Sequence, residues 1–240
     1  MLSTITYSFI AAAAAMLGAA LVLWFHKKAE KHSVLIISFS AGVMLAIAFT
    51  HLIPEGFEGN PHAHFYILAG FLAMFFLQFV ILFHPNHGDE CRTHEKIDVP
   101  ATIGLSFHSL IDGLIIAAGF EANAGLGMLT AFAVLLHKLP DGITISGILL
   151  HSGASKNKIF GFSLFTALFT PLGTIAGILL FKDVSQPALG ALLSAAAGSF
   201  IFLAASDLIP ETHESQSRIT PLMLFVGVAV ILAVEHFFKH

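Results

Sequence analysis

Long apolar segments recur along the chain at nearly regular intervals, separated by short polar stretches. They cover residues 4–25, 33–53, 63–83, 101–120, 125–150, 158–181, 186–209 and 219–238. Most are about as long as the 20 residues that an α-helix needs to cross the hydrocarbon core of a bilayer. The pattern therefore predicts an all-α integral membrane protein with eight transmembrane helices.

Composition agrees with this interpretation, and the eight spans leave almost no residues for a soluble domain. Of the 240 residues, 56% are hydrophobic and 11% charged, and the mean hydropathy is +0.86. The first apolar segment is an alternative candidate for a signal peptide. Its basic residues follow the apolar run, at Lys27, Lys28 and Lys31, so we interpret it as a retained span. The single cysteine, Cys91, excludes a disulfide within the chain.

The distribution of basic residues predicts an orientation. Loops after odd-numbered segments hold Lys27, Lys28, Lys31, Arg92, Lys96, Lys156, Lys158 and Arg218, whereas the opposite loops hold Lys182 and Lys239. Cytoplasmic loops are enriched in Lys and Arg, so we expect the odd-numbered loops in the cytoplasm and both termini outside it. The expected location is the cell membrane, inner or plasma.

Two segments of the chain resemble each other. AGVMLAIAFTHLIPEG at residues 41–56 aligns with AGSFIFLAASDLIPET at 197–212. They lie five spans apart and must cross in opposite directions, which predicts a 3+2+3 inverted-repeat arrangement like that of alternating-access transporters. The alternative is a relic of gene duplication with no mechanical role. The two central spans contain a second pair of similar motifs, HSLIDG at 108–113 and HKLPDG at 137–142.

These two motifs place four ionisable side chains inside apolar spans. His108 and Asp112 are four residues apart, as are His137 and Asp141, so each pair shares one helix face. A single intramembrane histidine is often a hydrogen-bonded core residue, but two such pairs are costly unless they face a partner or cavity. Two imidazoles and two carboxylates suit zinc, and also iron, manganese or cadmium. We predict a divalent-metal site here.

Lys138 lies beside these ligands, one turn from Asp141. A helix-end lysine that snorkels to the membrane surface is the alternative, but the depth of Lys138 argues against it. We expect its ammonium to form a salt bridge with a carboxylate and to fill the place of a second cation.

Polar groups nearer the membrane faces are weaker candidates. His51 and Glu55 end the second span on the outside, and Asp207, Glu211 and His213 end the seventh on the inside. They are either ligands where the ion enters and leaves or ordinary polar helix ends beside prolines. The loop 84–98 contains His84, His87 and His94 without fixed spacing, which predicts weak metal binding by a flexible cytoplasmic loop. Gly173 and Gly177 form a GxxxG pattern that predicts close helix packing.

The chain resembles the ZIP (Zrt/Irt-like) family of metal-ion transporters, of the prokaryotic type, over nearly all of its length. HSLIDG is similar to that family's HNxPEG motif and HKLPDG to its HxxPEG motif. The resemblance implies a single transmembrane transporter domain over 1–240, uptake of zinc toward the cytosol, and a homodimer. It also implies alternating access in which spans one, four, five and six move as a bundle. His108, Asp112, His137 and Asp141 fall on the family's primary metal positions.

Departures from the motifs bear on how many ions bind. Ser109 replaces the usual Asn, Ile111 the usual Pro, and Lys138 an acid that many members place at a second metal site. The sixth span, residues 159–181, lacks the carboxylate that members with two metals have there. We therefore expect one bound ion. Ser109 and Lys138 would lie at the second metal position and adjust its charge.

Two other functions compete with carrier transport. An intramembrane metalloenzyme would also hold histidines and aspartates around a metal, but it needs an open coordination position and a positioned base or nucleophile, for which Ser109 is the nearby candidate. The inverted repeat favours transport, so we predict no enzymatic activity, no cofactor and no nucleic-acid partner. A channel is not distinguished from a carrier by sequence.

Overall fold

The computed structural model describes residues 2–82, 98–181, 184–213 and 217–238, and all regular structure within them is helical. The α-helices are α1 (Leu2–Trp24), α2 (His26–Lys31), α3 (Ser33–Ile47), α4 (Ile53–Gly59), α5 (Ala63–Leu82), α6 (Asp98–Ala122), α7 (Ala124–His151), α8 (Lys156–Leu180), α9 (Gln186–Phe202), α10 (Ile209–His213) and α11 (Ile219–Phe238). Two π-helices, η1 (Ala48–Leu52) and η3 (Leu203–Leu208), join α3 to α4 and α9 to α10. His84, His87 and His94 lie outside the described residues.

The helices coincide with the predicted apolar segments. Seven continuous helical stretches in the described part of the chain are long and apolar enough to cross a membrane, including Ser33–Gly59 and Gln186–His213. An eighth apolar stretch, Ile219–Ala233 in α11, is shorter. Large apolar side chains such as Phe76 and Phe225 are exposed, as expected where a helix faces lipid. The prediction of an all-α, multi-pass membrane protein is confirmed.

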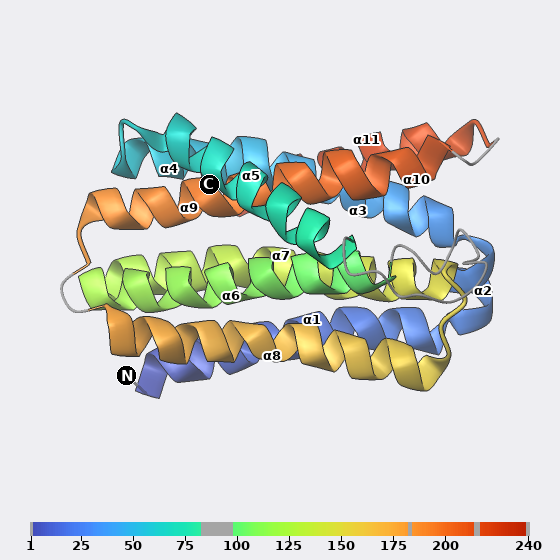
Figure 1. The fold of residues 1–240 in the computed structure, drawn as a ribbon, viewed down its shortest axis with the longest axis horizontal. Coiled ribbons are helices and arrows are strands. Elements are labelled where there is room, and N and C mark those ends of the chain that lie inside the picture. The colour runs from blue at the N-terminus through green and yellow to red at the C-terminus, as the bar shows by residue number, and fades with distance from the viewer. Residues whose placement is uncertain (1, 83–97, 182–183, 214–216, 239–240) are drawn as a thin grey trace.

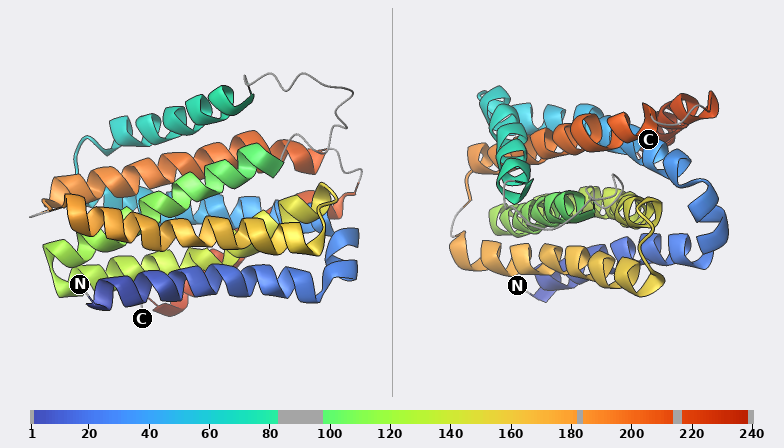
Figure 2. Two further views of the ribbon diagram at one scale, coloured as in Figure 1. Left: turned by 60° about the horizontal axis from the view of Figure 1, so that its bottom comes forward. Right: turned by 45° about the vertical axis from the view of Figure 1, so that its right-hand side comes forward.

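The helices pack as two units (Figure 1). α1, α6, α7 and α8 contact one another extensively and form the first unit, the transport bundle. In the second unit, the scaffold, α3 packs on α11, and α9 packs on α4 and α5. α5 lies at the periphery, as Figure 2 shows. The two units meet mainly where α7 contacts α3 and α6 contacts α9. The transport bundle comprises the spans that the family resemblance implies should move together.

Close helix approach within the transport bundle depends on glycine. A Cβ at Gly113 of α6 would meet the carbonyl oxygen of Thr170, and one at Gly173 of α8 would meet that of Leu110. A Cβ at Gly177 would meet the side chain of Ala117. The backbones of α6 and α8 therefore lie against each other near the predicted ligands, and the packing role predicted for the GxxxG pattern is confirmed.

Gly173→Ala is expected to destabilise the protein by about 1–3 kcal/mol, because the added methyl would push α8 away from α6. Thermal unfolding in detergent, followed by circular dichroism, measures the effect. Gly161→Ala is the matched control on the same helix, since nothing lies within 4 Å of a Cβ placed there. Equal unfolding temperatures for the two variants would contradict this account of the α6–α8 contact.

Both copies of the sequence repeat contain a π-helix at corresponding positions. η1 lies just before Pro54 and η3 just before Pro210. A proline ring clashes with the carbonyl four residues earlier, and widening of the helix to the π form relieves that clash. The shared distortion supports the predicted repeat. It also places His51 and Asp207 at equivalent points of the two copies, on helix segments of a kind that often accompanies functional sites.

Candidate metal site

The two HxxxD pairs come together between α6 and α7. One ligand atom each from His108, Asp112, His137 and Asp141 can be chosen so that all four lie within 4.8 Å of one another. All four side chains are buried. The helices α6 and α7 are neighbours joined at Asn123, whose side chain caps α7 by accepting a hydrogen bond from the Leu126 amide. The two helices run antiparallel and each has its ligands near its middle. Ligands that are 25 to 33 positions apart in sequence therefore lie close together.

Asp112 lies at the centre of the cluster. Its Oδ2 is 3.2 Å from Nε2 of His108, and its Oδ1 is 3.3 Å from Nε2 of His137. The same Oδ2 lies 2.7 Å from Nζ of Lys138. One carboxylate therefore faces both imidazoles and the ammonium.

Lys138 is 0% exposed, so it does not snorkel to the membrane surface. Its Nζ lies 3.1 Å from Asp141 Oδ2 and donates a hydrogen bond of 2.8 Å to Ser109 Oγ. With the ion pair to Asp112, the ammonium faces two carboxylates and a hydroxyl, and a buried charge requires such partners. The ammonium bridges the two carboxylates and leaves the cluster with a net charge of about −1 when both imidazoles are neutral.

The cluster has the donor set of a metal site. Several of its buried atoms lack a hydrogen bond of good geometry, namely His108 Nε2, Asp112 Oδ2, Asp141 Oδ1 and both ring nitrogens of His137. Buried polar atoms are almost always paired in folded proteins. Imidazole nitrogens and carboxylate oxygens that converge without hydrogen bonds fit a divalent transition ion as the missing partner.

The scaffold closes the site through α9, a contribution that the sequence reasoning missed. Ser199 Oγ lies 2.8 Å from Nδ1 of His108. The Phe200 ring stacks on His108, with centroids 3.7 Å apart and planes at 25°, and meets the His137 ring edge-on at 5.3 Å and 84°. One signal was present in the sequence, because Ser199 is a polar residue where the other copy of the repeat has Val43.

Comparison with known proteins agrees with the geometry. The sequence profile of the family described as ZIP zinc transporter matches residues 83–235. The chain belongs to the ZIP family. The match covers most of the chain, including both HxxxD pairs, and the metal-site chemistry found between α6 and α7 is what the family description implies.

Relatives of this ZIP protein come from animals and archaea. Zinc transporter zipt-7.1 of Caenorhabditis briggsae is 28% identical over 251 aligned positions, covering 75% of this chain and 62% of the relative. Human zinc transporter SLC39A7 is 34% identical over 165, covering 63% and 35%. A protein of Methanocaldococcus jannaschii, described as uncharacterized, is 29% identical over 199, covering 81% of each. The chain thus spans less than two thirds of the animal relatives it matches.

The other candidate ligands that the structure describes do not gather into a second metal site. Among the described residues, the two HxxxD pairs make up the only group of three or more metal-capable side chains within reach of one ion. His51 Nε2 pairs with Glu55 Oε1 at 3.5 Å, both partly exposed. Asp207 Oδ1 accepts a 2.8 Å hydrogen bond from Gln78 of α5, and His213 is exposed.

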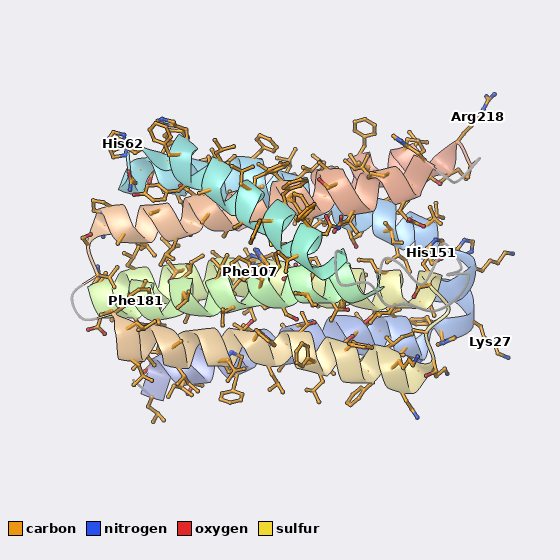
Figure 3. All side chains as sticks on the ribbon, viewed as in Figure 1. Lys27, His62, Phe107, His151, Phe181 and Arg218 are labelled. Atoms are coloured by element: carbon orange, nitrogen blue, oxygen red, sulfur yellow. The ribbon has the colours of Figure 1, made fainter. Side chains whose placement is uncertain are left out.

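Glu211 contacts a histidine that the sequence reasoning did not single out. Its Oε1 lies 2.6 Å from Nε2 of His151, the last residue of α7, and Nδ1 of His151 lies 3.0 Å from Ser33 Oγ. His151 lies at the end of the bundle that holds Lys27 and Arg218, opposite His62, whereas Phe107, beside His108, lies near mid-length (Figure 3). The His151–Glu211 pair therefore joins the transport bundle to the scaffold at the end rich in basic residues.

Proposed function

We propose that this chain carries divalent transition metal ions, zinc first among them, across the membrane toward the cytosol through His108, Asp112, His137 and Asp141. The observation that carries the proposal is the buried convergence of these imidazoles and carboxylates, five of whose nitrogen and oxygen atoms lack a hydrogen bond. Membership of the ZIP family and the names of the relatives support zinc as substrate. The same ligand set accepts iron, manganese and cadmium.

The proposed mechanism is alternating access by movement of the transport bundle against the scaffold. All four ligands belong to α6 and α7, so the ion would travel with one unit while α9 of the other unit covers it. His51 and Glu55 would receive the ion outside, and Asp207, Glu211 and His213 would pass it on inside. The equivalent positions of His51 and Asp207 on the two π-helices support this pairing.

A single ion is proposed per chain. The Lys138 ammonium bridges Asp112 and Asp141, where a second cation would otherwise neutralise them. Ser109, hydrogen-bonded to that ammonium, holds it in place. Residues 159–181 contain no carboxylate that would complete a second site. When the zinc ion leaves, Lys138 keeps the two carboxylates from facing each other uncompensated.

Further features of the protein, expected from the family resemblance and from the distribution of Lys and Arg, are proposed with the function. These are one transporter domain over the whole chain, a homodimer, odd-numbered loops in the cytoplasm and both termini outside. The gathering of Lys27 and Arg218 at one end of the bundle supports that orientation. His84, His87 and His94 would bind metal weakly in the cytoplasmic loop.

His151→Ala is expected to loosen the packing of the two helix units at the basic end, because it removes the contact between α7 and Glu211. An Ile148→Cys thiol, introduced with Cys91→Ser, then reacts several-fold faster with a membrane-impermeant thiol reagent added on the cytoplasmic side. Ser152→Ala is the control, since that hydroxyl donates a hydrogen bond within its own turn, to the Leu149 carbonyl. Unchanged labelling would show that the His151–Glu211 contact does not hold the two helix units together at this end.

Zinc flux into proteoliposomes tests the proposed function. Purified full-length protein should take up zinc with saturation kinetics, and His108→Ala should abolish uptake. Tight zinc binding without flux would favour an enzyme or sensor, whereas flux that does not saturate would favour a channel. Repeating the assay with iron, manganese and cadmium ranks the substrates.

A further inference from the structure

The bond between His108 and Ser199 connects a proposed metal ligand in the transport bundle to the scaffold. His108 belongs to α6 and Ser199 to α9, and the two atoms, Nδ1 and Oγ, are 2.8 Å apart. Both side chains are 0% exposed, so no water competes for the bond. Ser199 Oγ also lies 2.7 Å from the carbonyl oxygen of Ala196, to which it donates.

The two contacts of Ser199 favour one tautomer of His108. A hydroxyl has one proton, and Ser199 donates it to Ala196. Ser199 must then accept from His108, so Nδ1 carries the N–H. A neutral imidazole with a protonated Nδ1 has its lone pair on Nε2, the atom that faces Asp112 and the other ligands. Metal-binding histidines commonly have their second nitrogen fixed by such a partner.

Phe200 restricts the orientation of the His108 ring by stacking on its face. The two rings stack with centroids 3.7 Å apart and planes at 25°. The hydrogen bond fixes the rotation of the imidazole and the stack fixes its plane, so α9 holds His108 ready to bind an ion. Neither contact comes from the unit that carries the ligands.

We propose that Ser199 is a positioning residue that holds His108 in its metal-binding tautomer and makes zinc affinity depend on how the transport bundle lies against α9. The proposal rests on the proposed function, because it concerns the site that carries zinc there. With the bundle in the present position, Nε2 is presented as a ligand. When the bundle moves along α9, His108 loses both contacts and zinc affinity falls, which favours release.

Ser194 on the same helix shows what a purely structural serine does. It is 0% exposed and donates to the Gly190 carbonyl at 2.7 Å, with no histidine attached. If Ser199 bonded only to its own helix, as Ser194 does, the buried Nδ1–H of His108 would lose its acceptor. Ser194→Ala is therefore the matched control for Ser199→Ala.

The first test reads the tautomer directly in the metal-free, detergent-solubilised wild-type protein. Two-bond ¹H–¹⁵N correlation spectra of histidine-labelled protein should report an Nδ1–H tautomer for His108, with its signal identified by its loss in His108→Gln. An Nε2–H tautomer would overturn the proposal without any variant at Ser199. This measurement does not depend on transport, so it separates failure of the proposal from failure of the proposed function.

The second test measures zinc affinity by titration calorimetry. Ser199→Ala should weaken zinc binding about 10–100-fold and raise the transport KM by a similar factor, with little change in kcat. Ser194→Ala should leave both unchanged, and Ser199→Thr, which retains the hydroxyl, should restore most of the affinity. Wild-type affinity in Ser199→Ala would reduce Ser199 to a packing residue and overturn the proposal. If wild-type protein binds zinc but transports none, the positioning role stands and the transport function fails.

Discussion

Asp112→Asn is expected to lower zinc transport at least about 100-fold while the protein still folds. Asp112 is the carboxylate that faces both imidazoles and the Lys138 ammonium, within 2.7 to 3.3 Å. An amide of the same shape has no negative charge, so the site loses a ligand and its net charge rises to about zero. Removal of a residue that only supports a metal ligand typically lowers metal affinity or activity about 10–100-fold. Loss of a direct ligand should therefore have a larger effect.

Flux of radioactive zinc into proteoliposomes measures the effect of Asp112→Asn, with size-exclusion chromatography as the check on folding. Glu121→Gln is the matched control, because Glu121 is an exposed acid on the same helix, α6. We expect its flux to equal that of the wild type. Flux within a few-fold of wild type in folded Asp112→Asn would show that the ion does not pass through this cluster.

Lys138→Glu is expected to raise the number of zinc ions bound per chain from one to two. The ammonium contacts Asp112 and Asp141, so a carboxylate in its place would give three acidic groups that only a further cation can neutralise. Metal content of purified, dialysed protein, counted by inductively coupled plasma mass spectrometry, measures the change. An unchanged count would show that Lys138 does not occupy the position of a second cation.

Lys138→Met is the control for that experiment, because it removes the charge without adding a ligand. It should leave the count at one and destabilise the metal-free protein by about 3–5 kcal/mol, since two carboxylates lose a buried partner. Saturating zinc should recover part of that loss, because the ion binds the folded state. A second ion in Lys138→Met would show that charge alone, rather than a new ligand, controls the stoichiometry.

Much of the site was accessible from local sequence. The four-residue spacing of His108 and Asp112, and of His137 and Asp141, puts each pair on one face of any α-helix, and a short link makes consecutive spans neighbours. Intramembrane charges need partners, so the helical spacing predicts that the two pairs meet. The salt bridge of Lys138 was predicted on the same ground, because at that depth an ammonium needs a carboxylate.

Residues that contribute from other elements were not accessible in this way. Ser199 and Phe200 reach His108 from α9, about 90 positions later in the chain, and His151 meets Glu211 across the two helix units. No periodicity within one helix reports which residue of another helix lies opposite. Their contacts depend on how the transport bundle is seated on the scaffold.

The sequence by itself determined that this protein is a bundle of membrane-spanning helices with a buried His–Asp–Lys cluster, because hydropathy and helical spacing are local properties of the chain. Tertiary structure alone decided that α6 and α8 are the helices that meet at Gly113 and Gly173, that His151 contacts Glu211 across the two units, and that α9 contacts His108. Each of these is a contact between helices distant in sequence, and packing between such helices is a property of the whole fold.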